Sequence, residues 1–477
     1  MVTLPSLYER DGIEAYTDAL LDFVASPLVR QITGGIHVND ALIYRAWEAL
    51  PPAWTSWWST LPSSRLAQQD LIDAIDEKPL PTAITYGKQN AQDRPQSLTE
   101  WLGKLHSLAL PRAQRHCTRV ELPKILTERM KTKKIDEVSV ATAYIRDVCQ
   151  NNGITHIIDM GSGQGYLSLS LAYLFPNLRV LAIDGSERQI AASKTAALEL
   201  SITEDRVQHL VRYIDGTSLL TSELADWAKG QNCMLVGLHA CGNLSEHMIR
   251  YFTTAPFITH LGAVGCCYNH IIPRSLTHPD GFPISQRLRQ RDTKLSATAL
   301  MTGCQAPNNW EKPSESADSS VYSKRRFYRA LLEKVFHDEG IRLDTESRPV
   351  WGVRKGDMTS FVAFAKRAMH CLNIDQKHVA DDDELNACEA RHRDRGDEHK
   401  IAVLWTLSVL CCKVVESVIA MDRYWYLVEN GAQDVDVLPI FDYKISPRNL
   451  MMVASKPSGQ VKYVPMSLCG ERKTRSL

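Results

Sequence analysis

Apolar runs and helical spacing alternate in the middle of the chain. The runs cover residues 154–160, 178–184, 207–214, 233–239 and 259–267. Continuous apolar runs joined by segments with a helical period are typical of buried parallel strands connected by helices. The pattern predicts a Rossmann-like α/β fold with a doubly wound, mainly parallel sheet. Ligands of such sheets bind at the carboxyl ends of the strands.

Helical periodicity precedes the first run. Residues 1–128 contain short tryptophan-bearing segments punctuated by prolines, which predicts a helical N-terminal region. A helix from about Met130 to Val148 follows, and its first turn is rich in lysine. Those lysines either face solvent or fold over a ligand.

The alternation stops after the fifth run. Residues 268–400 are expected to form one large insertion with partly disordered loops, including the polar run 306–320, and a basic amphipathic helix at 322–337. Residues 381–400 hold eight acids and four bases with almost nothing apolar. That composition predicts a solvated linker or a disordered loop.

The closing elements return the chain to the sheet. A long apolar helix, 401–430, precedes two predicted strands, 435–441 and 449–456. An antiparallel hairpin of these strands is favoured over a pairing of 341–349 with 359–366, because an intact helix precedes it and a short turn joins it. The expected organisation is therefore 1–128, 129–267, 268–400, 401–457 and a tail, 458–477.

Composition narrows the choice of partners only slightly. The 477 residues are 44% hydrophobic and 23% charged, as in ordinary globular proteins, and 55 basic residues balance 55 acidic ones. No overall charge therefore draws the chain to nucleic acid or to a membrane. The overall charge does not, however, reveal whether a local basic groove is present.

Cysteines and apolar segments indicate the compartment. Twelve cysteines stand in a chain without an apolar leader, so we expect reduced thiols in an intracellular protein, cytoplasmic or nuclear. The run 401–412 ends at Lys413 and Glu416, short of the ~20 residues that a spanning helix needs. We expect a buried helix there and no contact with a membrane.

The clearest chemical signal follows the first run. Asp159 precedes Gly161, Gly163 and Gly165, which occupy alternate positions before helical spacing resumes. Glycines at a strand–helix turn let the backbone approach a ligand closely. A dinucleotide turn would place its third glycine where Tyr166 stands, and Asp159 would repel a phosphate. An acid there suits a cationic ligand instead, such as the amino group and sulfonium of S-adenosylmethionine (SAM).

Acids after the next runs extend this site. Asp184 lies about 19 residues beyond the turn, the spacing at which an acid meets a ribose hydroxyl, and Asp215 follows the third run. A purely structural turn would not need the paired acids, and Tyr166 and Asp159 disfavour a nicotinamide-dependent oxidoreductase. The predicted cofactor-binding residues are Asp159, Gly161, Ser162, Gly163, Gly165, Tyr166, Asp184, Asp215 and Lys134.

Five further motifs carry a resemblance to one protein family. They are GLHACGNL (237–244), GCCY (265–268), GFPIS (281–285), DRYWYLVE (422–429) and FDYKISPRN (441–449). With the glycine turn, they resemble the methyltransferase-like protein 25 family over residues 95–457. The resemblance implies the class I SAM-dependent methyltransferase fold, with SAM as cofactor. Asn243 and Asp136 stand where that family more often has an acid and a histidine.

Methyl transfer from a sulfonium is a direct displacement. The protein must align the acceptor and, for a weak nucleophile, remove its proton. Histidine suits that task near neutral pH, so His239 either acts on the acceptor or ties two strands together. The predicted catalytic residues are His239, Cys241 and Asn243, and the predicted substrate residues are Cys267, Tyr268, Phe282, Arg448 and Asn449.

Several residues near the fourth and fifth runs could bind metal. His239, Cys241, Cys266, Cys267 and His270 would suit zinc if the strand ends bring them together. Their spacing is not a repeated C-x-x-C pair, and adjacent cysteines rarely both reach one ion. We therefore predict no metal and small, inert thiols lining a tight pocket.

The acceptor is less well defined than the cofactor. LHACG and GCCY are similar to histidine–cysteine segments of tRNA 2'-O-methyltransferases, which keeps RNA under consideration. Tyr268 and Phe282 could stack on a base or belong to the core, and the basic helix from Lys324 to Arg329 could contact phosphates or face solvent. The sequence thus predicts a SAM-dependent methyltransferase acting on RNA or protein. The alternative is an inactive methyltransferase fold retained as a scaffold, and the oligomeric state stays open.

Overall fold

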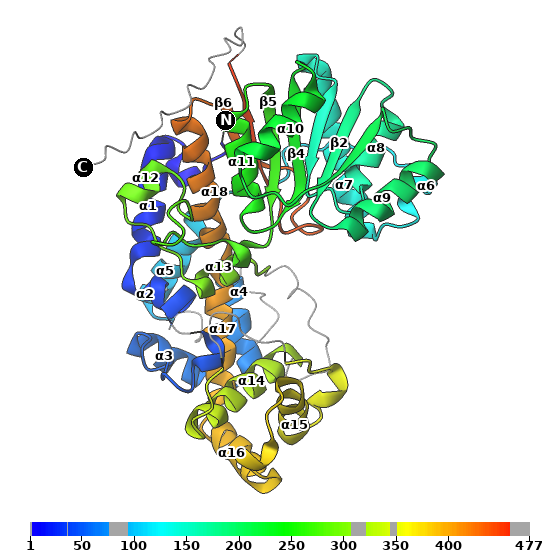
Figure 1. The fold of residues 1–477 in the computed structure, drawn as a ribbon. Coiled ribbons are helices and arrows are strands. Elements are labelled where there is room, and N and C mark those ends of the chain that lie inside the picture. The colour runs from blue at the N-terminus through cyan, green and yellow to red at the C-terminus, as the bar shows by residue number, and fades with distance from the viewer. Residues whose placement is uncertain (1, 36, 76–93, 307–320, 344–350, 458–477) are drawn as a thin grey trace, which may run out of the picture.

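A computed structural model describes residues 2–35, 37–75, 94–306, 321–343 and 351–457 (Figure 1). A seven-stranded sheet covered by helices forms one part, and a helical body lies beside it. The long helices α17 (Asp397–Leu410) and α18 (Cys412–Glu429) extend along both parts.

The sheet has the strand order β3-β2-β1-β4-β5-β7-β6. The first five strands pair in parallel, whereas β7 runs antiparallel to both β5 and β6. This confirms the predicted doubly wound sheet with an antiparallel terminal hairpin. The strands are β1 (His156–Met160), β2 (Arg179–Asp184), β3 (Val207–Val211), β4 (Cys233–Ala240), β5 (Ile258–Gly265), β6 (Gln433–Pro439) and β7 (Leu450–Ser455).

Helices cover both faces of the sheet, so the parallel strands are apolar on both sides. Successive residues of β1 point to opposite faces. Ile157 belongs to a cluster with Val138 of α7, whereas Ile158 belongs to a cluster with Phe252 of α11. The helices around the parallel strands are α7 (Thr132–Asn152), α8 (Tyr166–Leu174), α9 (Glu187–Glu199), α10 (Ser218–Ala228) and α11 (Leu244–Thr254).

The N-terminal region is helical, as predicted, and its tryptophans share one core. The Trp54 ring lies 6.0 Å from that of Trp58 and 5.5 Å from that of Trp101, centroid to centroid. Trp425 of α18 donates to Thr17 Oγ1 at 3.0 Å, which joins this region to the long helix. Its helices are α1 (Gly12–Ala25), α2 (Pro27–Arg30), α3 (Pro52–Thr60), α4 (Ser64–Ile75), α5 (Gln96–Ser107) and α6 (Lys124–Thr127).

The predicted long apolar helix begins earlier than expected, at Asp397, and contains a turn at Cys411. By length and composition, residues 397–429 could cross a membrane, but 83% of the most apolar window is buried against the rest of the chain. In this structure the segment is a core helix that packs against the N-terminal helices and the sheet.

The prediction of a linker or disordered loop at 381–400 is wrong. Residues 382–394 form helix α16 (Asp382–Asp394), and Asp381 and Glu384 make a capping box at its start. Acids in the first turn and bases in the last turn complement the helix dipole. Leu385 and Cys388 are buried, so two apolar residues suffice to attach the helix.

The insertion contains more helix than its composition suggested. Its other helices are α12 (Gln286–Gln290), α13 (Ala297–Gly303), α14 (Val321–Asp338) and α15 (Phe361–Leu372). Since α15 occupies 361–372, the disfavoured strand at 359–366 does not form. The predicted loop at 306–320 lies outside the described residues apart from Ala306, and the predicted tail, 458–477, lies wholly outside them.

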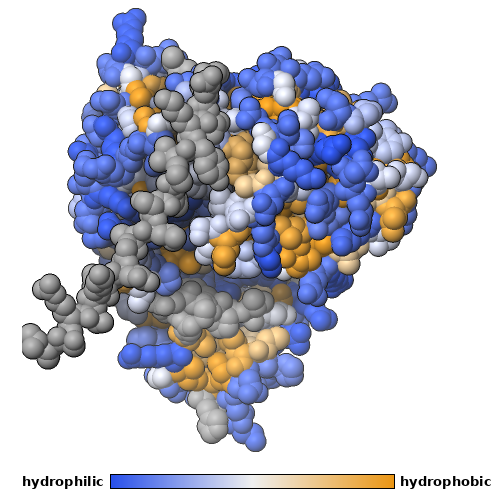
Figure 2. All heavy atoms as spheres, turned by 45° about the horizontal axis from the view of Figure 1, so that its top comes forward, coloured by the Kyte–Doolittle hydropathy of each residue, from blue (hydrophilic) through white to orange (hydrophobic). Residues whose placement is uncertain are grey.

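Figure 2 shows one face of the molecule, on which hydrophilic residues predominate and hydrophobic residues form separate patches. The sheet edge that holds the predicted site faces α13, because the short helix η4 (Tyr268–His270) after β5 packs against α13. Figure 1 places α13 between the sheet and the lower helices. The predicted site therefore lies next to both parts of the chain.

Candidate functional site

The glycine turn after β1 has a backbone that only glycine adopts readily. Gly161, Gly163 and Gly165 have φ values of 74°, 55° and 78°. A Cβ at Gly165 would lie 2.0 Å from Ser193 Oγ, and one at Gly161 would lie 2.8 Å from a methyl carbon of Leu244. The turn thus depends on absent side chains at two positions and on a left-handed backbone at all three.

Asp184, at the end of β2, holds this turn in place. Its Oδ2 accepts from Gly163 N at 2.9 Å, and its Oδ1 accepts from Ser186 N at 2.9 Å. The carbonyl of Ile183 accepts from the amides of Gly161 and Ser162 at 2.9 and 3.0 Å. Each carboxylate oxygen has a second lone pair, so Asp184 can hold the turn and still accept from a ribose hydroxyl.

Asp159 is a buried acid beneath the turn. It is 2% exposed, and its Oδ2 accepts from Ser168 Oγ at 2.6 Å. Burial raises the pKa of Asp159 to about 6, although the Ser168 bond opposes the shift. A cationic group brought close to Asp159 would favour its ionised form. The acid can therefore respond to a charged ligand.

The other predicted cofactor residues lie around the turn. Among the described residues, the buried Oγ of Ser162 has no hydrogen-bond partner, which leaves a polar atom for a ligand. The Tyr166 hydroxyl donates to Gln164 Oε1 at 2.7 Å and also lies 3.0 Å from Arg129 O. Asp215 lies on an exposed loop beyond β3, where a hydrogen bond from the Thr217 amide lowers its pKa.

Lys134 folds over the site instead of facing solvent. Its Nζ contacts His239 Nε2 and lies 3.1 Å from Glu137 Oε2, and His239 Nε2 lies 3.2 Å from the same oxygen. Ser446 Oγ donates to Glu137 Oε1 at 2.8 Å. Residues from α7, β4 and the closing hairpin therefore meet at one carboxylate.

Glu137 is the anionic centre of this group and is 2% exposed. Burial alone would raise its pKa, but the hydrogen bond with His239, the charge of Lys134 and the Ser446 hydroxyl outweigh burial and lower the pKa to about 2. The carboxylate therefore stays ionised and orients Lys134 and His239. His239 is 40% exposed in its side chain, so an acceptor can reach its ring.

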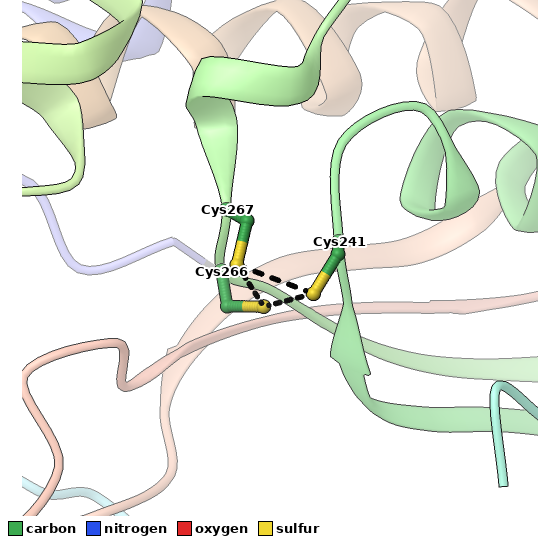
Figure 3. Close-up of side chains that lie close together, drawn as sticks. All are labelled: Cys241, Cys266 and Cys267. Atoms are coloured by element: carbon green, nitrogen blue, oxygen red, sulfur yellow. Dashed lines mark hydrogen bonds between the residues drawn. The ribbon is translucent and has the colours of Figure 1, made fainter. Parts of the chain in front are cut away.

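Three cysteine sulfurs converge after β4 and β5 (Figure 3). The Sγ of Cys241 lies 3.0 Å from that of Cys266 and 3.3 Å from that of Cys267, and the latter two are 3.6 Å apart. Hydrogen bonding from Cys266 lowers the pKa of Cys241 to about 5. Adjacent cysteines rarely both reach one ion, but the sulfurs of Cys266 and Cys267 both lie close to that of Cys241 here. The expectation that no metal binds stays a prediction.

Asn243 fastens the two cysteine-bearing loops together. Its Oδ1 accepts from Ile272 N at 2.9 Å, and the neighbouring Gly242 N donates to Cys267 O at 3.1 Å. A Cβ at Gly242 would come within 2.7 Å of His270 atoms, so the loops are in close contact. These contacts give Asn243 a positioning role, and its predicted catalytic role stays a prediction.

Four of the predicted substrate residues lie inside the structure. The Tyr268 hydroxyl donates to Glu416 Oε1 at 2.7 Å, and Arg448 Nη1 lies 2.9 Å from Glu416 Oε2. Asn449 is fully buried and donates to Phe441 O at 3.0 Å, while Phe282 is 4% exposed. Cys267 and Arg448 are half-buried, and Cys267 lies among the site residues. Stacking of an acceptor on Tyr268 or Phe282 would require rings that are covered here.

The sequence assigned no site role to Glu137 or Ser446, although the predicted hairpin turn that contains Ser446 was expected to face the pocket. Glu137 lies one helical turn after Lys134, and that i, i+3 spacing is the signal that could have paired them. Ser446 is 309 positions from Glu137, so no local sequence pattern predicts their hydrogen bond. Asp136, the departure from the family pattern, pairs with Arg119 at 2.8 Å on the neighbouring surface.

Comparison with known proteins agrees with this geometry. A family model described as a methyltransferase domain matches residues 131–274. The sheet order and that match define a protein with a class I methyltransferase fold. Within this class the chain is similar to "Probable methyltransferase-like protein 25" from Homo sapiens, with 27% identity over 263 residues, and from Mus musculus, with 26% over 295 residues. The resemblance inferred from the motifs is thereby confirmed.

The matches cover parts of each protein. The human alignment spans 50% of this chain and 40% of the relative, and the mouse alignment spans 58% and 47%. The chain thus matches less than half the length of these relatives. A solved coclaurine N-methyltransferase bound to N-methylheliamine and SAH is 13% identical, over 93% of this chain and 98% of that one, with a TM-score of 0.23. A TM-score of 0.23 is too low to support a shared fold, so the fold assignment rests on the strand order and on the family match.

Proposed function

We propose that this chain transfers a methyl group from SAM to an RNA or protein acceptor. The observation that carries the proposal is the turn of three left-handed glycines fastened to Asp184 above the buried Asp159. The turn leaves backbone accessible to a ligand, and the two acids suit a ribose and a cation. A phosphate-bearing dinucleotide would lie next to an acid instead of a helix amide.

The residues around His239 support proton removal from the acceptor. Lys134 Nζ can only donate, so His239 Nε2 either accepts from Lys134 or, in the other tautomer, donates its N–H to Glu137. The proposal uses the second tautomer, in which the lone pair of the ring is on Nδ1. Among the described residues, none makes a hydrogen bond to Nδ1. Glu137 therefore orients the ring, and Nδ1 takes the acceptor proton as the acceptor atom attacks the methyl carbon.

An arginine-rich cavity favours RNA over protein as the acceptor. The cavity has a volume of about 400 Å³ and is lined by α14, by Phe364 of α15 and by His37 and Asn39 of the N-terminal region. Arg325, Arg326 and Arg329 line it together with Trp351. Arg329 lies 4.1 Å from the Trp351 ring centroid, and burial lowers the pKa of Arg326. Arginines that line a cavity suit phosphates, whereas the Trp351 ring is buried and positions Arg329.

Helix α13 connects this cavity with the sheet edge. Met301 of α13 lines the cavity, and the carbonyl of Gly303 accepts from Arg448 Nη1 at 2.7 Å. A bound strand that occupied the arginines would therefore extend along α13 toward the cysteine loops. This geometry supports an acceptor much longer than a single nucleotide.

The test uses SAM labelled in its methyl group and total lysate from cells that lack the protein. The purified chain is added, and the products are digested with nuclease or with protease. Label lost only to nuclease is expected. Label lost only to protease would replace RNA by protein as the acceptor, and label equal to that of an inactive variant would contradict methyl transfer.

Gly163→Arg provides the inactive variant. Nothing lies within 4 Å of a Cβ at Gly163, so the arginine would fill the donor space, while its φ of 55° strains the backbone. Gly103→Arg is the matched control, because Gly103 also has nothing within 4 Å and lies in the exposed part of α5. The scaffold alternative predicts that cells carrying Gly163→Arg keep the function of the protein, whereas the enzyme predicts its loss.

A further inference from the structure

We propose that Cys241, Cys266 and Cys267 bind one zinc ion through three thiolates and leave its fourth position open. The three sulfurs lie within 4.8 Å of one another. The proposal goes beyond methyl transfer, since a metal at this place could bind whether or not SAM does. On binding, Zn²⁺ replaces the three thiol protons, which pass to solvent, and the site gains a net charge of about −1.

The distances fit a single ion. Zinc binds thiolate at about 2.3 Å in a tetrahedron, which places two ligand sulfurs about 3.8 Å apart. The observed separations are 3.0, 3.3 and 3.6 Å, so each pair needs to open by less than about 1 Å. A disulfide would join two of the sulfurs and leave the third unexplained. A polynuclear iron–sulfur cluster would bind each thiolate to a different iron and need a wider group.

The backbone brings the adjacent cysteines to the same point. Neighbours within a strand point to opposite faces, but β5 ends at Gly265, before both cysteines. Cys267 has φ −92° and ψ 72° and precedes η4, and Tyr268 N donates to Cys266 O at 3.2 Å. The turn rotates Cys267 toward Cys266. The bond from Gly242 N to Cys267 O then holds the Cys241 loop against both.

The open fourth position follows from what surrounds the sulfurs. Cys266 is buried and Cys267 is half-buried, but Cys241 is exposed, so a further ligand can enter from the side of Cys241. Cys304 lies nearby, yet its Sγ is held by Asn269 N at 3.3 Å and lies outside the group of three. Zinc sites with three protein ligands and an open position are typical of catalytic centres, whereas structural sites have four.

The primary measurement is the metal content of the full-length chain, purified without chelators, by elemental analysis. We expect about one zinc per chain in the wild type and near-complete loss in Cys241→Ser, Cys266→Ser and Cys267→Ser. Cys117→Ser is the matched control, because Cys117 is an exposed free cysteine away from the group. Cys304→Ser should keep its zinc. Zinc lost equally in Cys304→Ser would overturn the open site in favour of a closed four-sulfur one.

A second measurement keeps the proposal testable if the serine variants fail to fold. Cobalt replaces zinc in the wild type, and tetrahedral cobalt bound to thiolates gives intense sulfur-to-metal charge-transfer bands. We expect those bands to appear with one equivalent of cobalt and to vanish when zinc is added. Wild-type protein without zinc that gives no such bands would overturn the proposal.

The same samples separate this inference from methyl transfer. Gly163→Arg is expected to lose SAM binding and keep its zinc. A chain that binds zinc without binding SAM would contradict the proposed function alone. A chain that binds SAM but takes up neither zinc nor cobalt would contradict the metal site alone.

Discussion

The candidate site at the carboxyl ends of the strands has two halves, which are built in different ways. On the β1–β2 side, backbone amides and glycines form the surface, and the contacts join residues within about one strand–helix–strand unit. On the β4–β5 side, side chains from α7, the two cysteine loops and the closing hairpin meet, and Glu137 contacts Ser446 across 309 positions. The first half depends on local backbone shape. The second depends on the assembly of the whole domain.

Gly165→Ala should give the largest effect and break the first half alone. The new Cβ would lie 2.0 Å from Ser193 Oγ at a φ of 78°, so we expect a loss of about 2–5 kcal/mol in the free energy of unfolding. SAM affinity should fall on the order of 10²-fold or more, because the turn moves. Denaturation and calorimetry measure both. Gly103→Ala, on the exposed face of a helix, should lower neither the free energy of unfolding nor the affinity for SAM. Equal losses of stability and affinity in the two variants would contradict the account.

Glu137→Gln should break the second half and spare the first. The amide leaves Lys134 and His239 without an anionic partner, so kcat should fall on the order of 10²-fold while SAM affinity stays near that of the wild type. Glu100→Gln on the exposed face of α5 is the control. A Glu137→Gln enzyme with normal kcat would show that the network is structural.

The pH dependence of stability tests the same carboxylate. The folded-state pKa of Glu137 is lowered from 4.5 to about 2, so its stabilisation is present above 4.5 and is lost as pH falls from 4.5 to about 2. Wild type should therefore lose more stability than Glu137→Gln over this range. Parallel acid denaturation curves for the two proteins would refute the assigned ionisation.

Asp184→Asn should have a smaller effect, on the donor side. Both carboxylate oxygens accept backbone amides at 2.9 Å, and asparagine can replace only one of these acceptors. We expect a cost of about 1–3 kcal/mol and roughly tenfold weaker SAM binding. Asp226→Asn, at an exposed acid of α10, is the control. Unchanged SAM affinity in Asp184→Asn would remove Asp184 from the donor site.

Asp159→Asn should give the smallest change and separate structural from ligand-directed roles. The folded-state pKa of Asp159 is raised from 3.8 to about 6, so wild-type stability should fall as pH rises through this interval, and the variant should not show that fall. Above pH 6 the variant should be at least as stable as wild type, yet bind SAM several-fold more weakly. Equal SAM affinity would make Asp159 a purely structural acid.

The same contrast explains what could be predicted from the sequence. The glycine turn and Asp184 follow from local spacing. The predicted strands agree with the observed ones within two residues at either end, except that β3 ends three residues earlier than predicted. The contact between Glu137 and Ser446 could not be predicted from local spacing, because it forms only when the closing hairpin pairs with the sheet. The convergence of Cys266 and Cys267 was not expected, because the predicted strand ran through both residues, whereas β5 ends at Gly265.

Residues 381–400 show a different failure. Their charge suggested a solvated segment, but Asp381 and Glu384 have the spacing of a capping box, and Leu385 and Cys388 lie on one helical face. The capping box therefore stabilises helix α16 although the segment has few apolar residues. The spacing of Asp381 and Glu384 is the sequence signal that predicts the start of α16.

The most direct test of the account is calorimetric titration of the folded chain with SAM, alongside reduced nicotinamide dinucleotide. The account predicts saturable binding of SAM at one site per chain, loss of that binding in Gly163→Arg but not in Gly103→Arg, and no binding of the dinucleotide. Absence of SAM binding in a sample that unfolds cooperatively, or preference for the dinucleotide, would contradict it.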